Sequence, residues 1–203
     1  MPRLGVEPIR RDALVKATIA EIARAGSLDV TVAQIARRAG MSPALAHHYF
    51  GAKESLFLAA MRHILTLYGA EVRGALAAAE GPQGRLRAVV RASFGPGSFR
   101  REAVGAWLNF WVLAQTVPGA RRLLTVYRRR LRSNLRAGLR PLTPEAEVVA
   151  DTVAALIGGA YLRAALAPGA PDAAGAVAMV ERYLAAELGD GPGRRDRAVE
   201  PGG

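Results

Sequence analysis

The sequence predicts an all-α fold of about nine helices. Apolar residues recur three and four positions apart along nearly the whole chain, which is the period of an α-helix. Glycine and proline interrupt this pattern at regular intervals and mark the ends of helices. No stretch shows the alternation of apolar and polar residues that is typical of a half-buried strand.

Three short helices are expected within the first fifty residues. The first ends at Gly26, since glycine commonly terminates a helix. Thr31 has a hydroxyl suited to cap the second helix, which closes at Gly40. Ser42 caps the third helix, and Pro43 follows at the first helical position, where its missing N–H costs nothing.

Six longer helices fill the rest of the chain. The apolar pattern is broken at positions such as Gly81-Pro82 and Pro118-Gly119, so each unbroken segment is expected to form one helix. The last fifteen residues are rich in glycine and charge with few bulky apolar side chains, which predicts a disordered tail over 189–203. The expected helices cover 53–79, 83–94, 99–117, 120–139, 145–167 and 172–188.

Composition narrows the class of protein. A formal net charge of +11 and an isoelectric point near 11.2 indicate an anionic partner, of which nucleic acid is the commonest, although a merely solvated arginine-rich surface is the alternative. The absence of cysteine excludes disulfides, thiolate metal sites and cysteine nucleophiles. No carboxylate lies at metal-ligand spacing from a histidine, and no Ser/His/Asp signature is present, so we expect no metal, no cofactor and no enzymatic activity.

Two features of the hydropathy pattern predict a soluble protein. The first residues lack the apolar segment and cleavage site of a secretory signal. No run approaches the roughly 20 uninterrupted apolar residues of a membrane-spanning helix. We therefore expect a cytoplasmic chain with no membrane partner.

The second and third helices, with a tight glycine-containing turn between them, match a helix-turn-helix, whose latter helix enters the major groove of double-stranded DNA. Small residues at the start of that helix permit close approach to base edges, with Leu45 expected to point inward. Histidine, tyrosine and lysine side chains and the capping hydroxyls can then contact bases or phosphates. The candidate DNA-binding residues are Thr31, Ser42, Pro43, Ala44, Ala46, His47, His48, Tyr49 and Lys53.

An aromatic stripe in the second half of the chain suggests a small-molecule site. Trp107, Phe110 and Trp111 lie at i, i+3 and i+4, so they share one face of a helix. Such aromatic walls attract a quaternary ammonium group through cation–π interactions. Plain core packing is the alternative. Further candidate ligand-binding residues are Asn109, Tyr127 and Tyr161.

The last two helices suggest a dimer. Both carry apolar faces, and small residues beside them allow close approach of backbones, so two such hairpins could form a four-helix interface in a homodimer. Packing within one chain is the alternative. The candidate interface residues are Val153, Leu156, Ile157, Val177, Val180 and Leu184.

A basic segment over 120–140 contains eight arginines and no acidic residue. It could lie on nucleic acid or on a membrane surface. We favour a solvated face whose arginine stems cover apolar surface, because the helix-turn-helix already accounts for DNA binding.

The stretch TVAQIARRAGMSPALAHHYFGAKESLF, residues 31–57, resembles the DNA-binding domain of TetR-family transcriptional repressors. The family pattern is T-hydrophobic-x-x-I-A-x-x-A-G-hydrophobic-S, then a short helix ending in two aromatic residues, then K-x-x-L. The matching positions are Thr31, Ile35, Ala36, Ala39, Gly40, Ser42, Tyr49, Phe50, Lys53 and Leu56. The resemblance implies a homodimeric regulator of operator DNA, with a helix-turn-helix domain over 1–52 and a ligand-binding and dimerisation domain over 53–188.

Within that family the chain resembles the BetI type, which responds to choline and represses glycine-betaine synthesis genes. HHYFGAKESL, AWLNFW and AALIGGAYLRAAL are among the segments that carry this likeness. One departure concerns the ligand. Where such regulators commonly read Asp-Gly-hydrophobic-Trp, this chain has Gly158, Gly159, Ala160 and Tyr161, so a carboxylate and a tryptophan are both missing. The sequence therefore allows three interpretations of the function. The chain is a repressor that responds to choline, a repressor that responds to an unrelated cationic or neutral apolar effector, or a DNA-binding module without regulation.

Overall fold

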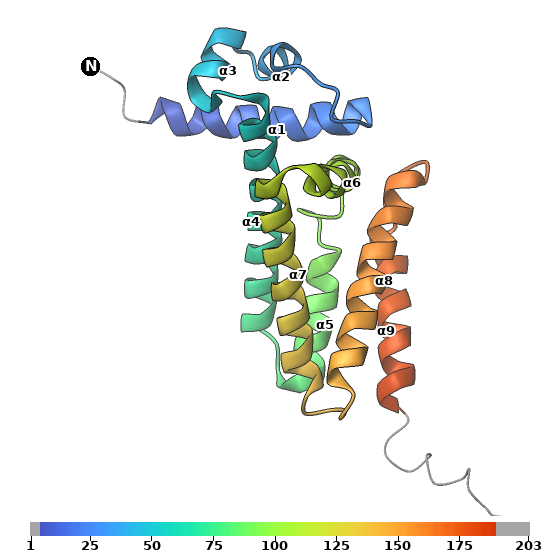
Figure 1. Ribbon diagram of the computed structural model, residues 1–203. Helices are drawn as coiled ribbons and strands as arrows, with labels where there is room; N and C mark the ends of the chain where they lie inside the picture. The colour runs from blue at the N-terminus through green and yellow to red at the C-terminus, as the bar shows by residue number, and fades with distance from the viewer. Residues whose placement is uncertain (1–4, 190–203) are drawn as a thin grey trace, which may run out of the picture.

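The computed structural model describes residues 5–189, which form nine α-helices (Figure 1). The predicted all-α fold is confirmed, and each expected helix lies within a few residues of an observed one. Of the predicted tail over 189–203, residues 190–203 lie outside the described residues, and Gly189 is instead the last residue of α9. The helices are α1 Val6–Ala25, α2 Val32–Arg38, α3 Pro43–Phe50, α4 Lys53–Ala77, α5 Gly81–Ser93, α6 Arg101–Thr116, α7 Pro118–Leu139, α8 Ala146–Leu166 and α9 Ala173–Gly189.

The caps of the first three helices are those that the sequence predicts. Gly26 takes the left-handed conformation, with φ of 65°, and its N–H donates to the Ile22 carbonyl. Thr31 forms a capping box with Gln34, in which each side chain accepts a hydrogen bond from the other residue's backbone N–H. The Ser42 hydroxyl accepts from the Leu45 N–H at 3.2 Å.

The nine helices form a small head above a larger body. Helices α1, α2 and α3 lie together at one end of the molecule, and the long helix α4 runs from this head down the side of the body (Figure 1). Helix α7 lies along α4, while α8 and α9 form a hairpin on the other side of the body.

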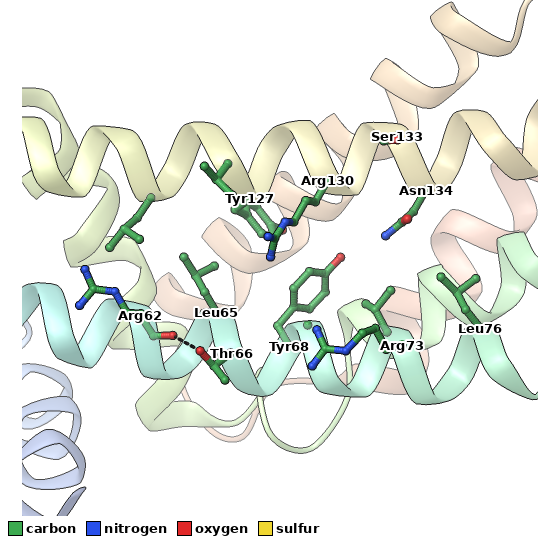
Figure 2. Close-up of a pocket in the computed structure, with 14 residues that line it drawn as sticks. Arg62, Leu65, Thr66, Tyr68, Arg73, Leu76, Tyr127, Arg130, Ser133 and Asn134 are labelled. Carbon is green, nitrogen blue, oxygen red and sulfur yellow. Dashed lines mark hydrogen bonds between the residues drawn. The ribbon is translucent and has the colours of Figure 1, made fainter. Parts of the chain in front are cut away.

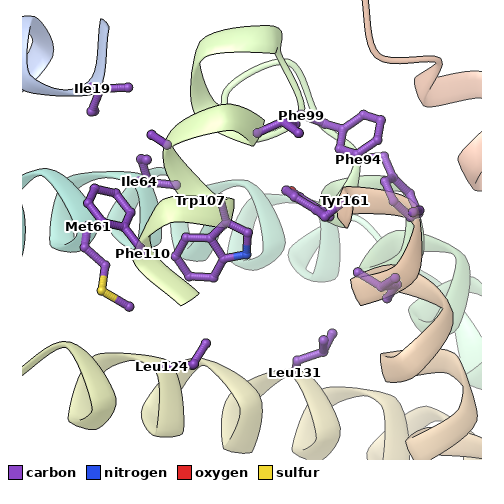
Figure 3. Packing of buried hydrophobic residues seen from close by; sticks show 14 of the residues in the cluster. Ile19, Met61, Ile64, Phe94, Phe99, Trp107, Phe110, Leu124, Leu131 and Tyr161 are labelled. Atoms are coloured by element: carbon purple, nitrogen blue, oxygen red, sulfur yellow. The ribbon is translucent and has the colours of Figure 1, made fainter. Parts of the chain in front are cut away.

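One apolar core runs through both parts. Figure 3 shows Ile19 of α1, Met61 of α4 and Phe110 of α6 in a single cluster that continues to Leu131 of α7 and Tyr161 of α8. Helix α6 forms much of this junction because it packs against α1. A Cβ added at Gly105 would lie 3.6 Å from both Cα and Cβ of Ala23, so a small residue lets the two helices pack closely here.

A buried carboxylate ties the head together. Glu21 of α1 is 5% exposed and accepts hydrogen bonds from Arg24 Nη2 at 2.7 Å and from Arg38 Nε at 2.6 Å. Arg38 is the last residue of α2, so this network joins α1 to the helix-turn-helix. The hydrogen bonds from Arg24, and then those from Arg38, lower the pKa of Glu21 below its usual 4.5.

We predict that Glu21→Gln lowers the free energy of unfolding by about 1–2 kcal/mol, since an amide loses the charge-assisted bonds while the two half-exposed arginines regain water. The native pKa of Glu21 is depressed, so this contribution is present above pH 4.5 and is lost as the pH falls through the native value. Chemical denaturation at pH 7 and at successively lower pH measures it. A difference between the wild type and Glu21→Gln that does not shrink in acid would contradict the assignment.

Candidate functional site

The outward surface of α3 carries most of the predicted DNA-reading residues. Ser42, Pro43, Ala44, His47 and His48 are all exposed. They lie at the start of the helix and on its solvent face, where a recognition helix presents side chains to base edges.

Ala46 corrects the prediction. It is fully buried, whereas Leu45, which was expected to point inward, is only half-buried. Ala46 packs in the core of the head, and its small size sets how closely α3 approaches the other helices of the head. Its side chain is therefore not available to a base.

His47 has a defined tautomer. Its Nδ1 lies 2.8 Å from the Gly51 carbonyl, which can only accept, so Nδ1 carries the proton. With the proton on Nδ1, Nε2 is an acceptor whenever the ring is neutral. Such an acceptor pairs with the exocyclic amino group of adenine or cytosine in the major groove.

Two residues of α1, missed by the sequence analysis, join this surface. Arg10 donates through Nη1 to the Tyr49 hydroxyl at 3.5 Å, a long hydrogen bond. The Arg11 guanidinium lies 5.1 Å from the centre of the Phe50 ring. Both arginines are exposed, and only the packing of α1 beside α3 could reveal their position. Lys53 completes the surface at the start of α4, with Nζ 5.3 Å from the centre of the Phe57 ring.

The aromatic residues of the body meet at a cleft of about 300 Å³ between α6, α7 and α8, called here the aromatic cleft. Trp111, Tyr127 and Tyr161 line it, so three of the six predicted ligand-binding residues come together from three helices. Tyr161 is held in place because its hydroxyl donates to the Ser93 carbonyl at 2.7 Å. Burial raises the pKa of both tyrosine hydroxyls well above the usual 10, so both rings are neutral.

The other predicted ligand residues lie elsewhere. Trp107 and Phe110 are 3% and 0% exposed and belong to the core, which corrects their expected role as walls of the site (Figure 3). Trp107 supports the wall from behind, with its ring centre 5.2 Å from that of Tyr127. Asn109 donates through Nδ2 to the Gly105 carbonyl at 3.0 Å, within its own helix.

Charged groups also line the aromatic cleft. Asp151 accepts from Arg132 Nη2 at 2.7 Å, and Arg128 lies on the same wall. The buried Nε1 of Trp111 has no hydrogen-bond partner among residues 5–189. Gly158 leaves room beside this tryptophan, because an added Cβ would meet Trp111 Cη2 at an ordinary 3.6 Å.

Comparison with known proteins agrees with this arrangement of a DNA-reading head and a ligand-sized cleft. Residues 14–60 match the model of bacterial regulatory proteins of the tetR family, and residues 82–189 match the C-terminal domain of BetI-type transcriptional repressors. The chain is 48% identical over 194 residues to the HTH-type transcriptional regulator BetI of Brucella suis, covering 95% of this chain and 98% of that one. The BetI regulator of Rhizobium meliloti is 46% identical over 196 residues, covering 94% and 97%.

The chain belongs to the TetR family, with a BetI-type C-terminal domain.

Solved structures share its fold. A transcriptional regulator from Pseudomonas aeruginosa PAO1 is 27% identical, with a TM-score of 0.77 over 93% of this chain and 94% of that one. A transcriptional regulator from Saccharomonospora viridis, solved in complex with choline, has a TM-score of 0.73 at 21% identity, covering 86% and 94%. This TetR-family chain is thus a ligand-responsive, DNA-binding transcriptional repressor, and its relatives are regulators rather than enzymes.

The predicted dimer residues of this TetR-family regulator need correction. Val153, Ile157, Val180 and Leu184 are buried within the chain, where α8 and α9 pack on the rest of the body. The outward face of α8 instead carries a stripe of apolar and small residues with alternating spacings of four and three, called here the α8 stripe. It consists of Val148, Thr152, Ala155, Gly159, Leu162 and Leu166. The remaining two predicted residues, Leu156 and Val177, are half-buried against the core.

Helix α8 is the one helix of residues 5–189 that is long and apolar enough to cross a membrane by length and composition. A core helix of a soluble protein passes the same test, and Val149, Val153 and Ile157 of α8 are buried in this core. No group of three or more His, Cys, Asp or Glu side chains in the described part of the chain is arranged to hold a metal ion.

We predict that Lys53→Ala weakens binding to every DNA sequence and reduces the slope of log K against log salt by about 0.9, the value of one phosphate contact. His47→Ala should instead change the preference among operator variants by about 1–3 kcal/mol at one base pair. Fluorescence anisotropy across a salt series, with DNA from upstream of the regulator's own gene, measures both. Arg129→Gln on α7 is the control, and an unchanged salt slope in Lys53→Ala would remove Lys53 from the interface.

Proposed function

We propose that this regulator is a cytoplasmic homodimeric repressor of choline and glycine-betaine genes that leaves its operator when a small quaternary ammonium compound binds the aromatic cleft. The observation that carries this proposal is the convergence of Trp111, Tyr127 and Tyr161 on one cleft. The BetI names of its relatives and the choline-bound state of the Saccharomonospora viridis regulator support the choice of ligand class.

The aromatic cleft offers suitable groups to such a ligand. Ring faces attract an ammonium group by about 1–2 kcal/mol per well-placed, desolvated ring. The unpartnered Trp111 Nε1 can donate to a hydroxyl such as that of choline. Asp151 supplies a carboxylate two turns before Gly158 on α8, although Arg132 already neutralises it.

An effector unrelated to choline, either a different cation or a neutral apolar metabolite, is the second candidate, and the charge of the cleft favours the neutral one. Arg128 and Arg132 both line the cleft against the single carboxylate of Asp151, so its net charge does not favour a cation. A neutral ligand would use the same aromatic walls without this electrostatic cost.

Two connections link the cleft to the DNA-binding head. Helix α4 does not line the cleft, but it packs against α7, which does, and it is continuous with the head at Lys53. Helix α6 carries Trp111 at the cleft and Gly105 against Ala23 of α1. A ligand that moves α6 would therefore tilt α1 and change the separation of the two recognition helices from the roughly 34 Å that successive major grooves require. A coupling free energy of about 1–3 kcal/mol is enough for release.

We predict that choline lowers operator affinity at fixed salt by about 5–150-fold and perturbs tryptophan fluorescence. The neutral isostere 3,3-dimethylbutan-1-ol should act much more weakly, because it lacks the positive charge. Titrating both compounds against operator complexes measures the effect. If only the neutral isostere releases the operator, the second candidate is selected. If neither compound releases the operator, the proposed class of effector is wrong.

Gly158 provides a matched test of the cleft. Gly158→Asp places a carboxylate beside Trp111, in a space that accepts a Cβ. This change should tighten choline binding by about tenfold, which corresponds to about 1.4 kcal/mol. Gly158→Asn has nearly the same shape without the charge and is the control. Equal choline affinity of the two variants would show that the cation lies elsewhere.

The α8 stripe is the proposed dimer interface. Leu162 and Leu166 are 42% and 72% exposed, and the small residues Ala155 and Gly159, earlier on the same stripe, allow two α8 helices to approach closely across a two-fold axis. Burying this stripe against its copy removes apolar surface from water and stabilises the dimer.

We predict that Leu162→Glu shifts the regulator from dimer to monomer at micromolar concentration and weakens operator binding, because unpaired like charges would be buried at the interface. Val112→Glu is the matched control, since Val112 is 55% exposed on α6 and lies outside the stripe. Sedimentation velocity measures the mass of each variant. A Leu162→Glu protein that stays dimeric while folded would place the interface on another face.

A further inference from the structure

A second cleft, of about 600 Å³, lies between α4 and α7. Its lining differs in character from that of the aromatic cleft, because three arginines reach it from both helices. Figure 2 shows Arg62 and Arg73 of α4 and Arg130 of α7 around it. We call it the arginine cleft.

The positive charge of the arginine cleft is not neutralised within residues 5–189. Arg62, Arg73 and Arg130 make no ion pair there, whereas Arg132 and Arg136 on the other side of α7 pair with carboxylates of α8. No aspartate or glutamate lines the cleft. Helix α7, which contains the arginine-rich segment, therefore has two charged faces. One face forms ion pairs with α8, and the other places Arg130 in the arginine cleft.

A buried hydroxyl faces the same cleft without a partner. Tyr68 is 7% exposed, and its hydroxyl has no hydrogen-bond partner in the described part of the chain. The nearby Ser93 hydroxyl donates instead to the Val89 carbonyl at 2.8 Å. In Figure 2 the Tyr68 hydroxyl points from α4 toward α7, between Arg130 and Asn134.

The Tyr68 hydroxyl is a donor at neutral pH, because burial raises its pKa above the usual 10. A buried donor without a partner costs free energy, which a bound acceptor recovers. The groups that converge here are thus a phenol O–H, guanidinium groups and the amide of Asn134, all of which can donate to an anion.

The floor of the arginine cleft is apolar. Leu65, Val72 and Leu76 of α4 and Leu123 and Val126 of α7 line it. The volume falls within the roughly 300–1,000 Å³ of small-molecule sites. We propose that the arginine cleft binds a small amphiphilic anion, with its apolar body against these side chains and its acidic group at Tyr68 and the arginines.

This site is distinct from the proposed ammonium site, because the arginines that line it face no carboxylate of residues 5–189. Tyr127 lines both clefts, with its ring centre 5.3 Å from that of Tyr68. An anion in the arginine cleft also touches α4 along its length, the helix that continues into the DNA-binding head. The anion site does not depend on choline being the effector.

Calorimetric titration of the full chain with two eight-carbon probes, octanoate and octanol, below their micellar concentrations tests the proposal. Octanoate should bind at least about tenfold more tightly than octanol, which has the same apolar body without the charge. The double variant Arg73→Gln/Arg130→Gln should weaken octanoate binding by about tenfold or more. Tyr68→Phe, which keeps the ring, should weaken it by about three- to tenfold.

Two arginines of α7 supply matched controls. Arg129 is exposed and lines neither cleft, while Arg128 lines the aromatic cleft but not the arginine cleft. Arg129→Gln and Arg128→Gln should therefore leave octanoate binding unchanged. Equal affinity for octanoate and octanol would overturn the proposal. So would a loss of affinity in Arg128→Gln or Arg129→Gln that matches the loss in the double variant.

Discussion

The continuity of one apolar core from head to body is the constraint on which the rest of the molecule depends. Ile19 of α1 and Leu131 of α7 belong to the same buried cluster, so the head cannot move as an independent unit without disturbing the body. Close-packed interiors have few voids, and they respond to strain by shifting between discrete arrangements. This property suits a repressor, in which a ligand bound in the body must change the position of α3 on DNA.

The charges of the molecule are organised around this core. The strongly basic composition serves more than one purpose. Arg38 pairs with buried Glu21 inside the head, and Arg132 pairs with Asp151 between α7 and α8, whereas Arg130 in the arginine cleft has no ion pair among residues 5–189. The net charge of +11 is therefore not simply a DNA-binding charge. Its distribution separates a predicted DNA-facing surface from two clefts whose linings differ in charge.

Local signals predicted the helices well, and burial was predicted less well. Thr31 and Ser42 cap their helices as expected, because a cap depends on residues only three positions away. The buried faces of α8 and α3 were predicted less accurately. Helix α8 is apolar nearly all round, and the helical period alone does not say which side packs against the body. Val153 and Ile157 consequently turned out to be core, and Ala46 lies inside the head where a base-reading role was expected.

The sequence by itself determined the number and approximate bounds of the helices, the helix-turn-helix and its family, because these depend on spacings within a few residues. Only the tertiary structure decided which aromatic residues meet. Trp111, Tyr127 and Tyr161 come from three helices and converge on one cleft, while Phe110, one position before Trp111, is buried in the core. The same holds for Arg73 and Arg130, which lie far apart along the chain. Their shared cleft exists because α4 and α7 run side by side, and a sequence period describes one helix at a time, not the neighbour it packs against.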